Sequence, residues 1–296
     1  MNHSAQPERS LPKVGLEHLT LRQEPLSVFV AAAAAGDAAS VCVSVRHPET
    51  HDRRVLRETV SRLDDLGIPI AMGDGFLLGP RTGLDVLRRG LDILRDMRAP
   101  MANVCAYEPD ADAPRDPGAT ADVLGEFCRI ARTAGVDVLL EFTPLSHVPS
   151  LGAAMGLVEQ LGLPNLRILV DTLHLVRAGE GPVDLRGIDR RLIGYCQLSD
   201  GALKYEGLAA YLDEANNDRS IPGDGEFPLA EILSLIPHDV TISAEVPLRR
   251  LERAGVPPEE RARRILEGSR RFLAGVRHRN MPAERPNSPG GRSPAA

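Results

Sequence analysis

Eight short apolar runs alternate with segments of helical periodicity between Val14 and Val276, and this alternation constrains the fold more than any other feature. Strands that are apolar on both faces and separated by helices are typical of a parallel sheet covered by helices. Eight such units in one chain predict a closed (β/α)8 barrel. The runs that predict its strands are 14–21, 39–45, 68–74, 102–108, 136–142, 166–171, 192–198 and 240–246.

The segments between these runs carry apolar stripes at helical spacing. An open doubly wound sheet would also alternate strands and helices, but no GxGxxG motif follows the first run, where a dinucleotide-binding sheet needs its phosphate loop. We therefore predict a single-domain α/β protein with the (β/α)8 TIM barrel architecture. The stretches predicted as helices are a short Ala-rich one around 27–35, then 55–66, 84–94, 122–134, 150–161, 183–191, 228–236 and 262–276.

Composition divides the chain into three parts. Residues 1–12 are polar and are predicted to be a disordered N-terminus, 13–277 form the barrel, and 278–296 form a disordered tail rich in Pro, Ser, Gly and Arg. The connection after the seventh strand is long, with an extra helical stretch at 203–216 followed by NDRSIPGDGEF. Long connections are often functional, and this one leaves the face of the barrel where active sites lie.

Charge and composition exclude several classes of partner. The net charge is −6, aromatic residues make up 3% and there is no Trp, so binding to nucleic acid is not expected. The longest run of low polarity, 27–35, is too short to span a bilayer, and the N-terminus lacks the apolar core of a signal peptide. We expect a cytoplasmic protein with a small-molecule substrate and no membrane contact, either as a monomer or as a homo-oligomer.

Four polar side chains directly follow aliphatic residues on successive strands of the second half. They are Glu141, Asp171, Gln197 and Glu245. Three carboxylates that converge at a barrel mouth repel one another unless a cation neutralises them. The oxygen ligands suit Mg²⁺ or Mn²⁺ better than a structural zinc. Pairing with arginine is the alternative, and we consider it weaker because arginines are sparse in these strands.

Polar residues at the other strand ends have a simpler explanation. Solvation of the strand end accounts for four such residues at least as well as a catalytic role. They lie at or just beyond the ends of predicted strands and are His47, Asp74, Glu108 and Asp200.

Five stretches resemble a known family: LLEFTPLS (139–146), ILVDTLHLVRAG (168–179), YCQLSD (195–200), RSIPGDGEFPL (219–229) and ISAEVP (242–247). In order and at barrel spacing, they are similar to the xylose-isomerase-like TIM barrels, which comprise sugar phosphate isomerases and epimerases together with endonuclease IV (AP endonuclease family 2).

The resemblance implies a set of site residues. Glu141, Asp171, Gln197 and Glu245 would hold one divalent cation, Mn²⁺ or Mg²⁺, with Co²⁺ or Zn²⁺ as alternatives. Glu141 and Glu245 would also flank the substrate as acid and base. By the same resemblance, His174 would contact a substrate oxygen, and Arg219 would bind a substrate hydroxyl, carboxylate or phosphate.

These residues predict a metal-dependent isomerase or epimerase that removes a proton next to a carbonyl and forms an enediolate. Most epimerase-like members carry His where this chain has Gln197, and Gln resembles a branch that includes 3-dehydroshikimate dehydratases. A metal-dependent dehydratase is therefore the alternative.

Two further functions are weaker alternatives. A nuclease like endonuclease IV needs additional His ligands, but 102–108 contains no His and the triplet after the seventh strand reads Asp218-Arg219-Ser220. A barrel that only binds a small molecule has no need of the two opposed carboxylates Glu141 and Glu245.

Overall fold

The computed structural model describes residues 12–79, 82–108, 110 and 114–279 of the 296-residue chain. Eight parallel strands pair in sequence order, and β1 pairs with β8 to close the barrel. The predicted (β/α)8 TIM barrel is confirmed. The strands are β1 (Gly15–Glu17), β2 (Val41–Ser44), β3 (Ile70–Leu77), β4 (Met101–Cys105), β5 (Asp137–Glu141), β6 (Leu166–Asp171), β7 (Ile193–Leu198) and β8 (Thr241–Ala244).

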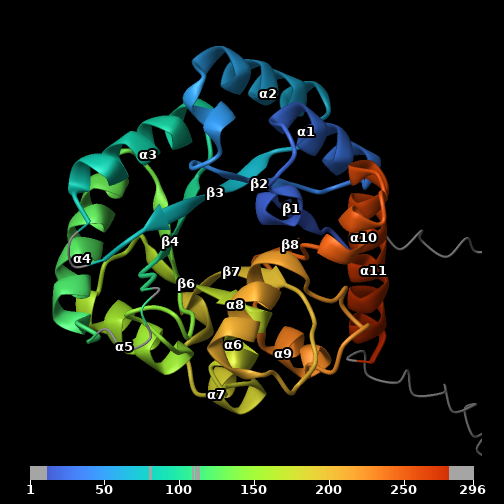
Figure 1. Ribbon diagram of the computed structural model, residues 1–296. Helices are drawn as coiled ribbons and strands as arrows, with labels where there is room; N and C mark the ends of the chain where they lie inside the picture. The colour runs from blue at the N-terminus through green and yellow to red at the C-terminus, as the bar shows by residue number, and fades with distance from the viewer. Residues whose placement is uncertain (1–11, 80–81, 109, 111–113, 280–296) are drawn as a thin grey trace, which may run out of the picture.

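Helices surround the barrel, and the first and last of them lie side by side where the ring closes (Figure 1). Within the described residues, no helix is both long enough and apolar enough to cross a membrane. The helices are α1 (Leu26–Ala35), α2 (Arg53–Asp65), α3 (Leu84–Met97), α4 (Pro117–Thr133), α5 (Leu151–Leu161), α6 (Thr172–Arg177), α7 (Pro182–Arg186), α8 (Gly207–Asn217), α9 (Leu229–Leu235), α10 (Arg249–Arg253) and α11 (Pro258–Arg279).

The barrel interior is filled below the mouth by a layer of apolar side chains. Inward-pointing residues alternate with outward-pointing ones along each strand, so this layer lies two residues before the polar strand ends. The packed layer separates the polar mouth from the opposite end of the barrel. Its fully buried members are Cys42, Met72, Leu139, Leu169 and Tyr195.

Strand register brings the predicted site residues to one end of the barrel. Asp171 at the end of β6 lies opposite Gln197 of β7, and Gln197 lies opposite Ser243 of β8. Glu245 follows two residues later, so it points into the barrel from the same face as Ser243. Glu141 ends β5. The carboxyl ends of these four strands therefore form one side of the mouth.

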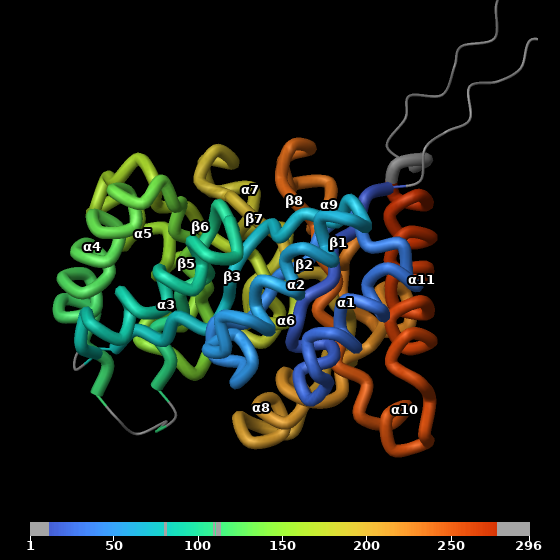
Figure 2. Tube along the Cα trace, turned by 90° about the horizontal axis from the view of Figure 1, so that it is seen from above, coloured from blue at the N-terminus to red at the C-terminus, as the bar shows by residue number. Residues whose placement is uncertain are grey.

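The long connection after β7 contains α8, which lies beyond the carboxyl ends of the strands (Figure 2). We call residues 201–217 of this connection the arm. Asp200 fixes the loop that follows this arm, because its carboxylate accepts hydrogen bonds from the backbone nitrogens of Gly223, Gly225 and Phe227 at 2.9–3.1 Å. Backbone hydrogen bonds between Asp200 and Ser220 add a short antiparallel bridge. Asp200 is thus a structural residue that positions the segment carrying Arg219.

Several boundaries differ from those predicted. The first strand ends at Glu17, because residues His18–Leu21 turn into a 3-10 helix whose side chains bind neighbouring strands. His18 accepts a hydrogen bond from the Ser44 backbone, and Thr20 bonds to Ala244 and Val246.

The ends of the chain and two helices also differ in extent. The helix predicted over 183–191 stops at Arg186, and α8 begins at Gly207 rather than at 203. Helix α11 reaches Arg279, two residues into the predicted tail 278–296. Residues 1–11 and 280–296, which carry most of the two predicted disordered segments, lie outside the described residues.

Candidate active site

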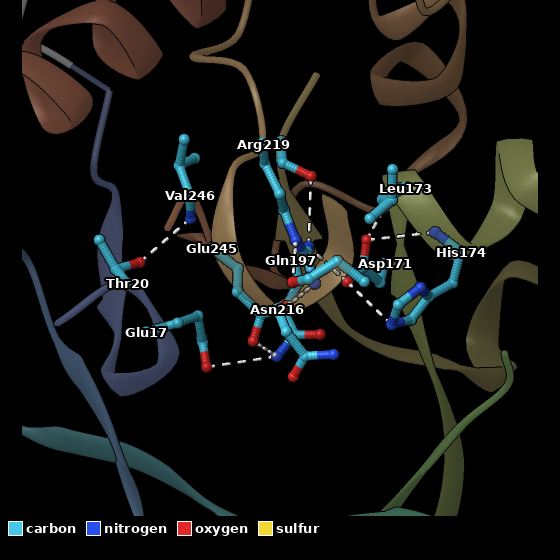
Figure 3. Close-up of polar contacts among 12 residues, drawn as sticks. Glu17, Thr20, Asp171, Leu173, His174, Gln197, Asn216, Arg219, Glu245 and Val246 are labelled. Carbon is cyan, nitrogen blue, oxygen red and sulfur yellow. Dashed lines mark hydrogen bonds and ion pairs between the residues drawn. The ribbon is translucent and has the colours of Figure 1, made fainter. Parts of the chain in front are cut away.

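The predicted site residues gather at the barrel mouth and are joined by a continuous network of hydrogen bonds and ion pairs (Figure 3). All of them are buried, with side chains between fully enclosed and about one-tenth exposed. They come from β5, β6, β7, the start of α6, the segment after α8 and the residue after β8. The residues are Glu141, Asp171, His174, Gln197, Arg219 and Glu245.

Glu141 is oriented by partners on both of its oxygens. Asn103 of β4 donates to Oε2 at 2.9 Å, and Nε2 of His174 lies 3.4 Å from Oε1. Asn103 is itself buried, and its own side-chain oxygen has no partner among the described residues. The carboxylate of Glu141 therefore has a defined orientation into the mouth.

Asp171 serves both the local fold and the site. Its Oδ1 caps the N-terminus of α6 by accepting from the backbone nitrogen of Leu173 at 2.7 Å. Its Oδ2 accepts from Nη1 of Arg219 at 2.8 Å and lies 3.5 Å from Nε2 of His174. Burial raises the pKa of the Asp171 carboxyl, but Arg219 and His174 outweigh it and lower the pKa to about 2.

All three side-chain nitrogens of Arg219 bind other groups of the protein. Its Nη2 lies 2.9 Å from Oε2 of Glu245, its Nη1 pairs with Asp171, and its Nε donates to the backbone oxygen of Ala215. The scarcity of arginines in the strands predicts that pairing with arginine is the weaker explanation for these carboxylates. That inference was wrong, because the arginine comes from the connection after α8 and reaches two of the carboxylates from above the strands.

Gln197 and Glu245 are joined directly. The Gln197 Nε2 donates to Oε1 of Glu245 at 3.1 Å. Burial raises the pKa of Glu245 well above its ordinary value, and the neighbouring carboxylates add to this rise against the effect of Arg219. The Gln197 Oε1 is buried and has no hydrogen-bond partner among the described residues. One strong acceptor in the mouth is therefore left without a donor.

Glu17 is a further carboxylate of the mouth, and it is not among the residues predicted from the sequence. It ends β1, is fully buried, and accepts from the hydroxyl of Tyr195 at 2.8 Å and from Nε2 of Gln197 at 3.3 Å. Burial raises the pKa of Glu17. The signal that could have revealed it is a lone acidic residue inside an otherwise apolar strand, in the sequence Gly-Leu-Glu.

His174 is held by the arm above the barrel. Its Nδ1 lies 2.8 Å from the hydroxyl of Tyr211 on α8, and that hydroxyl lies 2.7 Å from Oγ1 of Thr143. The Nε2 of His174 is thereby directed to Glu141 and Asp171. Tyr211 was not predicted as a site residue, because nothing in the sequence of α8 indicates that it reaches back to the barrel.

A cavity of about 320 Å³ opens above these groups. Its polar side carries Glu141, Glu245, Arg219 and His174, and its apolar side includes Phe76. This volume is at the lower end of the range of small-molecule pockets. The remaining lining residues include Leu19, Leu77, Leu145, Tyr107, Asn103 and Asp74.

Asp74, for which solvation of a strand end seemed an equally good explanation, also faces this cavity. Loss of water around its carboxyl group and the nearby charge of Glu17 raise its pKa to about 7. Glu108 does not line the cavity and instead lies 3.6 Å from His147.

The mouth has a strong excess of negative groups and suits a cation. Ligand atoms of Glu141, Asp171 and His174 lie within 4.8 Å of one another. Arg219 pairs with two of the carboxylates, Asp171 and Glu245. Burial is the main cause that raises the pKa values of Glu17, Asp74 and Glu245. The side chains of Glu141, Asp171 and His174 form a donor set that fits a divalent cation, and among the described residues Glu245 is not part of this group. The buried oxygen of Gln197 is a further acceptor without a partner in the described part of the chain.

Comparison with known proteins identifies the family of this barrel. Residues 29–272 match the family model described as xylose isomerase-like TIM barrel. An inosose isomerase from Halalkalibacterium halodurans is 31% identical over 117 residues, which cover 39% of this chain and 40% of that protein. The chain thus matches less than half of the length of this relative.

Solved structures of low sequence identity share the fold. A fusion of a xylose isomerase-like TIM barrel with 4-hydroxyphenylpyruvate dioxygenase has a TM-score of 0.76 at 20% identity, over 94% of this chain and 46% of that one. The IolI protein with a bound zinc atom has a TM-score of 0.72 at 16% identity, over 91% and 99% of the two chains.

A third structure, from Bacillus anthracis and described as the probable 3-DHS dehydratase AsbF, has a TM-score of 0.70 at 15% identity, over 89% and 99%. The family match covers most of the barrel, from α1 to α11. This chain therefore belongs to the xylose isomerase-like TIM barrel family.

Proposed function

We propose that this protein is a divalent-metal-dependent isomerase or epimerase that moves a proton on the carbon beside a carbonyl of a small polyhydroxy substrate. The observation that carries the proposal is the pair Glu141 and Glu245, which reach one cavity from β5 and from the end of β8. Two carboxyl groups at one cavity can remove a proton and return one.

The cation would be held by Glu141, Asp171, Gln197 and Glu245, and His174 is close enough to Glu141 and Asp171 to assist. When bound, a divalent cation polarises a substrate carbonyl and makes the neighbouring C–H bond more acidic. Mn²⁺ and Mg²⁺ suit the oxygen-rich donor set, and zinc is the alternative suggested by the zinc-containing IolI structure.

The two glutamates would have different roles because their environments differ. Glu141 accepts a hydrogen bond from Asn103 and lies beside His174, so its carboxylate is held in a defined orientation to act as the base. Glu245 lies between Arg219 and Gln197 and would hold or return the proton on the other side of the substrate. His174, oriented by Tyr211, would contact a substrate oxygen.

The charge of the cavity favours an uncharged substrate. Among its described lining residues, Arg219 is the only arginine or lysine, and both of its terminal nitrogens are engaged by carboxylates. A phosphate or carboxylate on the substrate would therefore lack a free cationic side chain there. The similarity to inosose isomerase over part of the chain also supports a neutral cyclic or linear polyol ketone.

Dehydration is the second candidate reaction, and Gln197 is the observation that favours it. Most epimerase-like members carry His at this position, whereas this chain carries Gln. Gln at this position resembles the branch that includes 3-dehydroshikimate dehydratases. Proton removal beside a carbonyl followed by loss of a β-hydroxyl would need the same two glutamates. The carboxylate of dehydroshikimate fits the acidic mouth less well than a neutral polyol does.

Substrate screening in D₂O distinguishes these reactions. The purified protein would be supplied with Mn²⁺ or Mg²⁺ and incubated with inososes, ketoses, hydroxy-oxo acids and dehydroshikimate, followed by proton NMR. We expect deuterium beside the carbonyl and an isomer or epimer of a neutral polyol ketone. A product that has lost water would establish the dehydratase instead, and no reaction with any of these compounds would contradict both functions.

A further inference from the structure

We propose that Glu17 is a positioning residue that holds the side-chain amide of Gln197 with its oxygen available to the metal ion. The inference rests on the proposed metal site and concerns a residue outside the predicted ligand set. It is carried by the hydrogen bonds that surround the Gln197 amide.

An amide can present either of two chemically different ends to a cation. Its oxygen is a good ligand, whereas its NH₂ group carries two hydrogens, donates two hydrogen bonds and repels a cation. A histidine ligand does not face the same choice, since either ring nitrogen can bind a metal. Gln197 therefore needs neighbouring groups that determine which end faces inward.

The structure supplies an acceptor for each N–H of Gln197. Nε2 lies 3.3 Å from Oε2 of Glu17 and 3.1 Å from Oε1 of Glu245, and Figure 3 marks both contacts with dashed lines. Both acceptors are carboxylates, so a rotation of the amide by 180° would place its oxygen against two oxygens. With both N–H groups occupied, Oε1 is the end left without a partner.

Glu17 is itself fixed in place. The hydroxyl of Tyr195 donates to its other oxygen at 2.8 Å, and both residues are fully buried. Tyr195 and Gln197 lie two residues apart on β7 and point into the barrel, so Glu17 crosses from β1 to bind two successive inward side chains of β7. The two oxygens of Glu17 therefore bind Tyr195 and Gln197, and Glu17 itself does not line the cavity.

The substitution Glu17→Gln tests this role. A glutamine at this position can donate to Oε1 of Gln197, which would turn the amide and direct its NH₂ group to the cation. We expect Glu17→Gln to weaken Mn²⁺ binding by about 10–100-fold, the usual effect of losing a group that orients a metal ligand. The measurement is calorimetric titration of Mn²⁺ into chelator-treated full-length protein, with circular dichroism as the check of folding.

Two control variants separate orientation from charge and from damage at position 17. Asp74→Asn also removes one carboxylate from the mouth but does not touch Gln197, so it should weaken Mn²⁺ binding much less. The double variant Glu17→Gln/Gln197→Glu exchanges the two side chains. Because a carboxylate has an oxygen at each end, this exchange should restore most of the lost affinity.

The outcomes are distinct. If the wild type does not bind Mn²⁺, both the inference and the proposed metal dependence fail. If the wild type binds and Glu17→Gln binds equally well, or loses no more affinity than Asp74→Asn, the inference alone is overturned. Should Glu17→Gln not fold, Tyr195→Phe removes the hydroxyl that holds the other oxygen of Glu17 in place, and unchanged affinity in that folded variant would overturn the inference.

Discussion

The Nη1 atom of Arg219 lies 2.8 Å from Oδ2 of Asp171, although the two residues are 48 positions apart in the chain. Both side chains are at most 1% exposed. The ion pair joins the end of β6 to the segment after α8 and so connects the arm above the barrel to the candidate metal site. It also provides the mouth with one permanent positive charge.

Replacing Arg219 with Met should destabilise the metal-free protein. Asp171 and Glu245 would then face each other without their shared partner, and loss of one member of a buried ion pair costs about 3–5 kcal/mol. Denaturant unfolding in the presence of a chelator measures this change. Added Mn²⁺ should recover part of the lost stability, because a bound cation would neutralise the same carboxylates.

Arg177→Met is the matched control for this experiment. Arg177 is also buried and pairs with a carboxylate, Glu214 of α8, but it is not part of the mouth. Its loss should lower stability to the same extent with and without Mn²⁺. If Mn²⁺ rescues both variants equally, or neither, the link between Arg219 and the cation is wrong.

Substitution of the central carboxylates should abolish turnover without unfolding the barrel. Glu141→Gln, Asp171→Asn and Glu245→Gln each remove a proposed ligand, and two of them remove the proposed acid or base, so kcat should fall by about 10²–10⁴-fold or more. Glu108→Gln changes a rim carboxylate outside the cavity and should keep wild-type activity. Activity in any of the three variants comparable to that of Glu108→Gln would refute these roles.

Tyr211→Phe should reduce activity through His174. The variant keeps the ring but removes the hydroxyl that lies between His174 and Thr143. A net hydrogen bond of about 1 kcal/mol corresponds to roughly a fivefold effect on kcat if it is lost in the transition state. Tyr205→Phe, on the same arm but with its hydroxyl on the backbone oxygen of Arg177, is the control. Equal kinetics of the two variants would exclude a role for Tyr211 in orienting His174.

Asp74 should make the stability of the metal-free protein depend on pH. Its pKa is raised to about 7 in the folded state, so between about pH 4 and 7 the folded protein holds a proton that the unfolded chain has lost. Stability must therefore fall as pH rises through this window, by at most about 1.4 kcal/mol per pH unit, and level off above it.

Unfolding of the wild type and Asp74→Asn between pH 5 and 8, with chelator present, measures this contribution. As pH rises, the free energy of unfolding of the wild type should fall relative to that of Asp74→Asn. Parallel pH profiles would show that Asp74 titrates at its ordinary pKa.

The barrel and one side of its mouth could be predicted from the sequence because both depend on local patterns. Each of Glu141, Asp171 and Gln197 ends an apolar strand, and parallel strands deliver their ends to one face. Strand order alone was sufficient to bring these residues together.

The groups that orient the site could not be predicted in the same way. Arg219 and Tyr211 come from the long connection after β7, and how far such a segment folds back depends on contacts such as those of Asp200. The predicted first strand, 14–21, was too long, because the chain turns into a 3-10 helix immediately after Glu17. Glu17 was therefore not recognised as a residue at the end of a strand. The residues beside the proposed catalytic carboxylates thus depend on tertiary contacts that a single sequence does not display.

Metal-dependent deuterium exchange tests the central claim most directly. The protein would be treated with a chelator, incubated in D₂O with the polyol ketone that reacts best, and examined by NMR before and after one equivalent of Mn²⁺ is returned. We predict no exchange beside the carbonyl in the chelated protein and rapid exchange once Mn²⁺ is restored. Equal exchange in the two samples would contradict the account.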